Sequence, residues 1–232
     1  MTRPRTDPPN QVTQASTGID VRVAGALVAV LVVGVALLGL VVRVNGPLTI
    51  DVTLPPAVMA WYPPPATDLF DTIGTLPVFG GIVVVLGLVG FLVLHRPGLA
   101  VACVVALCGE IPATAAKLIV DRPRPPASTE IEAFVTAASY PSGHTVRAVL
   151  IAGLVVAAIG WRHRSVVLRV VAVIVGVSFV AAVGLARIAS GQHWPTDVLG
   201  GLMLGTAWLA VCLVVADWVD RRTAPRSEVP PT

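Results

Sequence analysis

The sequence predicts an all-α membrane protein, a polytopic bundle of six transmembrane helices with both termini cytoplasmic. Of its 232 residues, 55% are hydrophobic and only 12% are charged, and the mean hydropathy is +0.84. This composition is far more apolar than that of an average soluble domain. The basic residues fall mostly in short segments between apolar runs, so the net charge of +3 reflects membrane topology. Nucleic acid is not expected as a partner.

The first apolar run, residues 23–42, contains no charge and is long enough to cross a bilayer. It is too long for a signal-peptide core, and no clear small-x-small cleavage site follows it, so we interpret it as a retained span. The Pro-rich segment 45–71 that follows contains Trp61 and Tyr62, which is typical of an interfacial loop. The other five expected spans are residues 73–94, 98–120, 143–161, 166–189 and 195–218.

The ends of the chain lack apolar periodicity, so residues 1–20 and 221–232 are expected to be disordered cytoplasmic tails around a membrane domain at 21–220. Most arginines that flank the spans fall on the side of the two termini, which makes that side cytoplasmic. Three segments on the opposite side carry nearly all the remaining basic residues. This exception to the charge bias points to a function at the extracytoplasmic face.

The first of these segments begins at Lys117, the only lysine in the chain, near the outer end of the third span. Arg124 follows seven residues later in a proline-rich stretch that is held extended. The two cations can therefore face one cavity.

A histidine and a carboxylate lie close together in the third segment. Arg187 is near the outer end of the fifth span, and His193 and Asp197 are four residues apart around Pro195, a favoured first-turn residue. A carboxylate beside an imidazole fixes its tautomer and leaves the other nitrogen to attack or to accept a proton.

The second segment places polar residues at the start of the fourth span. Ser142 is expected as the helix N-cap, and Gly143 removes side-chain bulk beside His144. The unpaired amides of such a first turn bind anions. Because Lys117, Arg124 and Arg187 more than neutralise a phosphoryl group of charge about −1.5 to −2, the predicted ligand is a phosphate ester.

The three segments "KLIVDRPRP", "PSGH" and "RIASGQHWPTD" occur in this order between Lys117 and Asp197. They resemble the signature motifs KxxxxxxRP, PSGH and SRxxxxxHxxxD of the type-2 phosphatidic acid phosphatase superfamily, the lipid phosphate phosphatases related to vanadium haloperoxidases. One position departs from the pattern, because Ala186 stands where the third motif has serine. This removes one possible hydroxyl contact to the phosphate.

The resemblance implies a mechanism without metal or cofactor. His193 attacks phosphorus and forms a phosphohistidine, Asp197 holds His193, and His144 protonates the leaving group and then activates water. The phosphate oxygens would be bound by Lys117, Arg124, Ser142, Gly143 and Arg187.

Several functions remain open at this stage. The favoured substrate is undecaprenyl diphosphate or another polyprenyl diphosphate, by analogy. Phosphatidic acid, phosphatidylglycerol phosphate and a polyprenyl-linked sugar phosphate are alternatives, and the same site could serve a phosphotransferase. A transporter that uses intramembrane Glu110 is a further alternative, although the paired broken helices typical of one are not evident. The oligomeric state is not indicated.

Some polar residues receive no catalytic role. Glu110 is interpreted as a protonated or paired packing group, with a proton or substrate element as the alternative, and Arg122 and Arg147 as headgroup or loop contacts. His95 and His163 are expected at the cytoplasmic interface. The three cysteines lie inside apolar runs without metal-ligand spacing, and the small residues of "GGLMLG" in the last span are expected to permit close helix packing.

Overall fold

The computed structural model describes residues 19–126, 128, 137–163 and 165–224, and this part of the chain is helical without strands. Among these described residues, six helices or helix pairs are long and apolar enough to span a membrane. The predicted six-helix architecture is therefore confirmed. The spans are α1 (Val21–Asn45), α4 (Leu76–Leu88) continued by the π-helix η1 (Val89–Val93), α5 (Pro97–Leu107) with α6 (Glu110–Val120), α7 (Gly143–Arg162), α8 (Val166–Ala189) and α9 (Pro195–Thr223).

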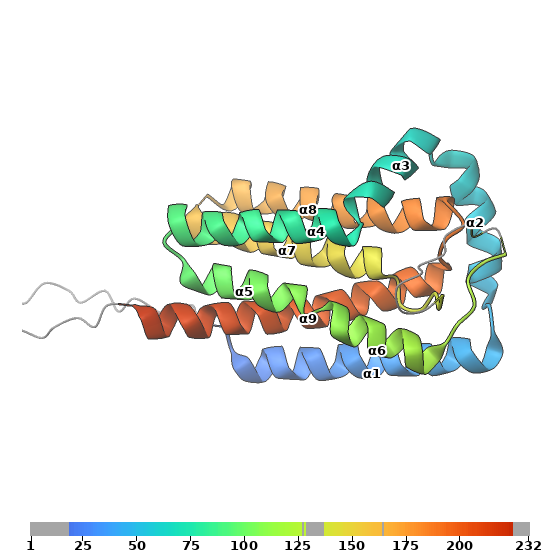
Figure 1. Cartoon of the computed structure of the whole chain (residues 1–232), viewed down its shortest axis with the longest axis horizontal. Coiled ribbons are helices and arrows are strands. Elements are labelled where there is room, and N and C mark those ends of the chain that lie inside the picture. The colour runs from blue at the N-terminus through green and yellow to red at the C-terminus, as the bar shows by residue number, and fades with distance from the viewer. Residues whose placement is uncertain (1–18, 127, 129–136, 164, 225–232) are drawn as a thin grey trace, which may run out of the picture.

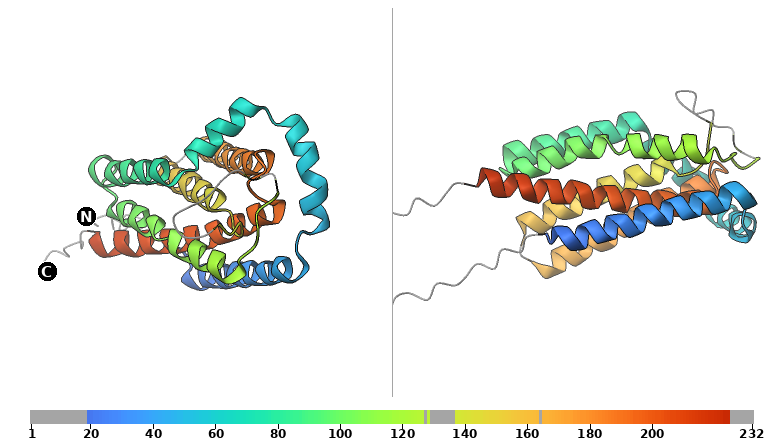
Figure 2. Two further views of the ribbon diagram at one scale, coloured as in Figure 1. Left: turned by 45° about the vertical axis from the view of Figure 1, so that its right-hand side comes forward. Right: turned by 90° about the horizontal axis from the view of Figure 1, so that it is seen from below.

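The spans run side by side along one axis, and α9 lies among them with its main contacts to α1, α5 and α7 (Figures 1 and 2). The start of α1 and the end of α9 lie at one end of the bundle. The opposite end, where α6 and α8 end and α7 and α9 begin, is called the motif end below. The expected tails fall largely outside the described residues, and α9 continues to Thr223.

Glycines allow α9 to approach its neighbours closely, as the small residues of the last span predict. A Cβ at Gly201 would lie 2.6 Å from the Ser142 carbonyl oxygen, and one at Gly200 would overlap the Tyr140 ring. Gly98 of α5 is in the same position against the Ala216 carbonyl oxygen of α9. Gly201 therefore brings α9 against the backbone at the start of α7, and Gly98 brings α5 against the backbone of α9 at the opposite end of the bundle.

The third span is not the continuous helix that the sequence predicts. It breaks between α5 and α6 at Cys108 and Gly109, because Pro112 has no N–H to donate to the carbonyl of the preceding turn. The Trp208 indole of α9 donates to the Val105 carbonyl beside the break, at 2.8 Å. Glu110 consequently begins a new helix within the bundle.

The segment expected as an interfacial loop forms two short helices, α2 (Thr49–Trp61) and α3 (Pro64–Ile73), so that expectation is wrong. Asp51 accepts a hydrogen bond from the Leu48 amide at 2.9 Å and closes the first turn of α2. Pro64 stands at the first position of α3, where a proline is tolerated. Both helices pack against α8 at the motif end (Figure 1).

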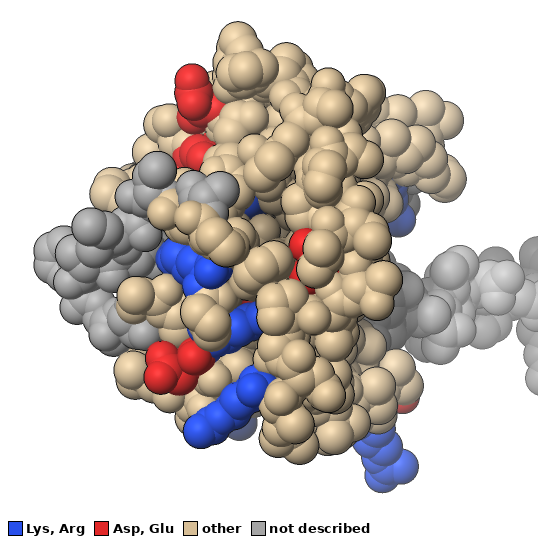
Figure 3. All heavy atoms as spheres, turned by 90° about the vertical axis from the view of Figure 1, so that its right-hand side faces the viewer, with Lys and Arg blue, Asp and Glu red and all other residues tan. Residues whose placement is uncertain are grey.

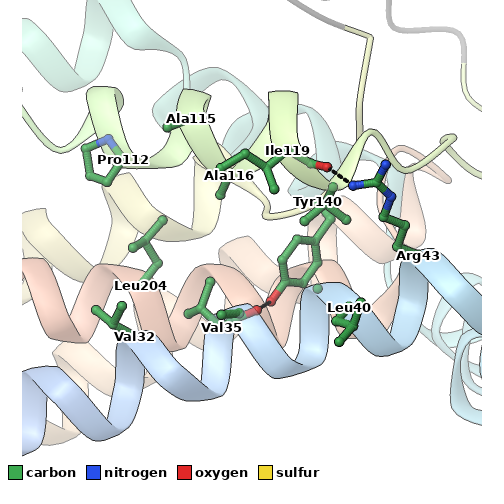
Figure 4. Close-up of a pocket in the computed structure, with 13 residues that line it drawn as sticks. Val32, Val35, Leu40, Arg43, Pro112, Ala115, Ala116, Ile119, Tyr140 and Leu204 are labelled. Carbon is green, nitrogen blue, oxygen red and sulfur yellow. Dashed lines mark hydrogen bonds between the residues drawn. The ribbon is translucent and has the colours of Figure 1, made fainter.

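Tyr140 anchors the segment before α7 to α1. Its hydroxyl donates to the Val35 carbonyl at 2.7 Å, and its ring lines an apolar groove of about 360 Å³ between α1, α6 and α9 (Figure 4). At the groove's end, Arg43 donates to the Ile119 carbonyl at 2.6 Å and joins α1 to α6. The bond from Tyr140 to α1 thereby holds the segment that leads into α7.

We expect Gly98→Ala to destabilise the bundle by about 1–3 kcal/mol, because the added methyl group must displace the α9 backbone. The measurement is the thermal unfolding midpoint in one detergent, followed by tryptophan fluorescence. Gly80→Ala in α4 is the matched control, because a Cβ there meets nothing within 4 Å. Equal midpoints for the two variants would contradict the close contact between α5 and α9.

Candidate active site

All the residues that the sequence assigns to the site lie at the motif end of the bundle. Lys117 is near the end of α6, His144 in the first turn of α7, Arg187 in the last turn of α8 and Asp197 in the first turn of α9. Figure 3 shows this end, where Lys and Arg side chains gather with acidic side chains beside them. Arg124 is partly buried, and the others are buried: Lys117, Ser142, Gly143, His144, Arg187, His193 and Asp197.

The turn between α8 and α9 presents His193 to the site. Gly191 adopts a left-handed conformation, with φ of 68°. The amides of Gln192 and His193 both donate to the Arg187 carbonyl, at 3.2 and 3.1 Å. These two bonds hold the backbone of His193 next to that of Arg187.

His193 and Asp197 meet across the first turn of α9, as predicted. The distance from His193 Nδ1 to Asp197 Oδ2 is 3.4 Å, and the same oxygen accepts the Trp194 amide at 2.9 Å. Because Asp197 is at Nδ1, Nε2 is the ring nitrogen that faces away from the carboxylate. This is the geometry of an oriented imidazole base or nucleophile.

The start of α7 differs in one detail from the prediction. Ser142 is the N-cap residue of α7, but its side chain makes no capping hydrogen bond to the described backbone and instead accepts from the Thr145 hydroxyl at 3.1 Å. Its amide donates to the Asp197 carbonyl at 3.0 Å. The second and third motifs are therefore joined directly.

His144 lies in a strongly cationic environment. Arg187, Arg147 and Lys117 are the cationic groups close enough to act on it, and the His193 ring is close enough to do so when it is protonated. Gly74, between α3 and α4, covers its ring so closely that a Cβ there would overlap it. His144 therefore lies near His193 and near two of the predicted phosphate-binding cations, Arg187 and Lys117.

The predicted phosphate-binding arginines make two kinds of contact. Arg124 donates to the carbonyls of Gln192 at 3.0 Å and Ala137 at 3.2 Å, so it also holds the backbone next to His193. Arg187 forms an ion pair with Asp71 of α3, with 2.9 Å between Nη1 and Oδ1. Asp71 is not among the predicted site residues, because it lies in the segment interpreted as a loop.

Asp71 also affects Tyr62. Burial, together with the nearby Asp71 carboxylate, raises the pKa of the Tyr62 hydroxyl, which donates to the Ala182 carbonyl of α8 at 2.9 Å. The carboxylate thus lies between α3 and the end of α8.

Glu110 is a paired group, as the favoured interpretation predicts. Its two oxygens accept from Arg147 Nε and Nη2, both at 2.8 Å. Arg147 Nη1 also donates to the Gly74 carbonyl at 2.9 Å. Arg147, left outside the site by the sequence analysis, therefore connects α6, α7 and the α3–α4 junction next to His144.

Arg122, like Asp71 and Arg147, is not among the predicted site residues. It is buried and contacts Asp197 of the predicted site at 2.5 Å and Asp51 of α2 at 2.7 Å. Its position between Lys117 and Arg124 is the only signal in the sequence that could have identified it.

Ala186, the departure from the third motif, is fully buried. It belongs to a small apolar cluster with Val58 of α2 and Val198 of α9. In this chain the position serves helix packing.

Two comparisons with known proteins bear on this site. The structure resembles the crystal structure of a transmembrane PAP2 type phosphatidylglycerolphosphate phosphatase from Bacillus subtilis. The TM-score is 0.67, the sequence identity is 19%, and the match covers 86% of this chain and 98% of that chain. At this identity the likeness shows the fold. The model of the PAP2 superfamily matches residues 98–221, which contain all three motifs and more than half of the chain. The chain therefore belongs to the PAP2 superfamily.

Proposed function

We propose that this protein is an integral membrane lipid phosphate phosphatase that works through a phosphohistidine at His193. The observation that carries the proposal is the pairing of buried His193 with Asp197, in a turn whose amides donate to the Arg187 carbonyl. His144 is close enough for the two histidines to interact electrostatically. Membership of the PAP2 superfamily supports a phosphatase. No metal or cofactor has a part in the proposed reaction.

In the first step, His193 Nε2 attacks phosphorus in line with the leaving oxygen. A P–N bond forms, and the bond from phosphorus to the leaving oxygen breaks, which releases the lipid alcohol from a monoester or the lipid phosphate from a diphosphate. His144 gives its proton to that leaving oxygen. The His193 ring becomes positive, and the Asp197 carboxylate at Nδ1 stabilises that charge.

In the second step, His144 accepts a proton from water, and the resulting hydroxide attacks phosphorus. The P–N bond breaks, His193 becomes neutral again and phosphate leaves. Lys117, Arg124 and Arg187, with the Gly143 amide and Ser142, would bind the non-reacting oxygens, where negative charge develops.

The site is proposed to face the extracytoplasmic side of a cell membrane, with both chain termini cytoplasmic. The arginines at the opposite end of the bundle, such as Arg96, Arg162 and Arg221, support this orientation. A phosphate site at a bundle end suits a lipid whose headgroup enters it while the tail stays in the bilayer.

The lipid substrate is proposed to be a polyprenyl diphosphate such as undecaprenyl diphosphate. Phosphatidylglycerol phosphate is the second candidate, because the solved structure with the same fold is named as a phosphatase of that lipid.

We expect purified protein to release phosphate from a lipid phosphate in excess EDTA, with inhibition by orthovanadate. Removing the nucleophile in His193→Ala should abolish release, while Asp197→Asn and His144→Ala should each lower kcat by about 100-fold or more. Size-exclusion elution and circular dichroism control for folding. Strict dependence on an added divalent metal, or near-normal turnover by His193→Ala, would contradict the mechanism.

The substrate is tested by comparing kcat/KM for undecaprenyl diphosphate, farnesyl diphosphate, phosphatidic acid and phosphatidylglycerol phosphate in mixed micelles. We expect the polyprenyl diphosphate to be cleaved with the highest kcat/KM, by about tenfold or more. Preference for phosphatidylglycerol phosphate would instead establish the second candidate. A further reaction with glycerol present, analysed for phosphorylated glycerol, separates hydrolysis from phosphotransfer.

We expect Asp71→Asn to bind inorganic phosphate about three- to tenfold more tightly, because a phosphoryl group must otherwise replace the Asp71 carboxylate at Arg187. Competitive inhibition by phosphate measures the effect. The matched control is Asp68→Asn, an exposed carboxylate on the same helix. Weaker phosphate binding by Asp71→Asn would mean that Asp71 orients Arg187 for the substrate.

A further inference from the structure

Three buried charged side chains from separate parts of the chain form a row behind His193. Asp51 of α2, Arg122 of the segment after α6 and Asp197 of α9 are at most 2% exposed. Arg122 Nη2 is 2.7 Å from Asp51 Oδ2, and Arg122 Nη1 is 2.5 Å from Asp197 Oδ1. The other Asp197 oxygen faces His193. The order of charges is therefore negative, positive, negative and then the imidazole.

Asp51 also fixes the start of α9. One of its oxygens accepts the Thr196 amide at 3.0 Å, across 145 residues of sequence. The Thr196 hydroxyl lies 2.8 and 2.9 Å from the two Asp51 oxygens and accepts from Arg122 at 2.7 Å. Thr196 precedes Asp197, so these bonds set the position of the carboxylate that holds His193.

The indole of Trp194 closes the row on one side. It lies over the Arg122 guanidinium, 5.4 Å from the ring centroid to Cζ, and donates to the Pro123 carbonyl at 3.0 Å. Water is thus kept from the ion pairs, and charges interact strongly where water is excluded.

The alternation of charge matters for a nucleophile that becomes positive. Arg122 alone would offset the Asp197 carboxylate and weaken its attraction for a positive imidazole. Asp51 balances Arg122, so the row keeps a net charge of −1 next to His193. Burial makes this charge effective, because the surrounding dielectric is low.

We infer that Asp51 and Arg122 are positioning residues that act through Asp197 to hold His193 and to stabilise the positive charge on its ring during phosphoryl transfer. The inference rests on the proposed function, in which His193 is the nucleophile. It assigns a role in the reaction to α2, which lies outside the residues matched by the family model.

The test compares two ligands of the purified full-length protein in detergent, without turnover. Orthovanadate can form a five-coordinate adduct bonded to the His193 ring, which places positive charge on that ring as the transition state does. Inorganic phosphate forms no bond to His193 and is held only by the phosphate-binding groups. Affinities for both are measured by isothermal titration calorimetry, and kcat and KM are measured on the best lipid substrate.

Asp51→Asn is expected to weaken vanadate binding and to lower kcat, each by about tenfold, while phosphate affinity and KM change by less than about twofold. Asp68→Asn, the exposed carboxylate on α3, should leave both affinities unchanged. Unaltered vanadate affinity in Asp51→Asn, or an equal loss for vanadate and phosphate, overturns the inference.

A double variant separates charge from packing. Asp51→Asn combined with Arg122→Met loses more contacts but restores a net charge of −1 beside His193. It should therefore bind vanadate more tightly than Asp51→Asn alone. Equal or weaker binding would show that the row acts by packing only, which overturns its electrostatic role.

If Asp51→Asn is not recovered as folded protein, Asp51→Glu decides the question because it retains the charge. It should keep the ratio of vanadate to phosphate affinity within about threefold of wild type, and a tenfold fall overturns the inference. Failure of the proposed function appears separately, as wild-type protein that releases no phosphate from any lipid tested. The two affinities still report on the row in that case.

Discussion

The motif end depends on Asp197, because four groups from neighbouring segments contact this buried residue. Its oxygens contact His193, Arg122 and the Trp194 amide, and its carbonyl accepts the Ser142 amide. A carboxylate buried in this way is stable only with a full set of partners. The ends of α7, α8 and α9 are consequently held in one arrangement.

The two short helices that precede the second span supply acidic partners to this arrangement. Asp51 of α2 balances Arg122, and Asp71 of α3 pairs with Arg187. Their roles differ, because the Asp51 pair is buried whereas Asp71 remains partly exposed. A permanently buried pair suits positioning, and a more accessible pair is what the proposed exchange of Asp71 for a phosphoryl group requires.

A second set of contacts supports His144 from the other side. The break in the third span brings Glu110 to Arg147, and Arg147 binds the Gly74 carbonyl above the His144 ring. Each histidine therefore has an ion pair next to it, Arg122 with Asp197 for His193 and Arg147 with Glu110 for His144. Each pair also binds a backbone group, the Trp194 amide or the Gly74 carbonyl. Such support limits the movement of both side chains, as the proposed phosphoryl transfer to His193 with proton transfer by His144 requires.

The sequence by itself determined the six spans, because an uninterrupted apolar run of membrane length has few alternatives. It also placed His144, His193, Asp197, Lys117, Arg124 and Arg187 at one end of the bundle, since their spacing puts them at or next to helix ends. Only the tertiary structure decided that α2 and α3 are helices and that Asp51 and Asp71 belong to the motif end. Polar, proline-rich segments carry no apolar period, and the bond from Thr196 to Asp51 joins residues 145 apart, so packing rather than local propensity brings these partners together.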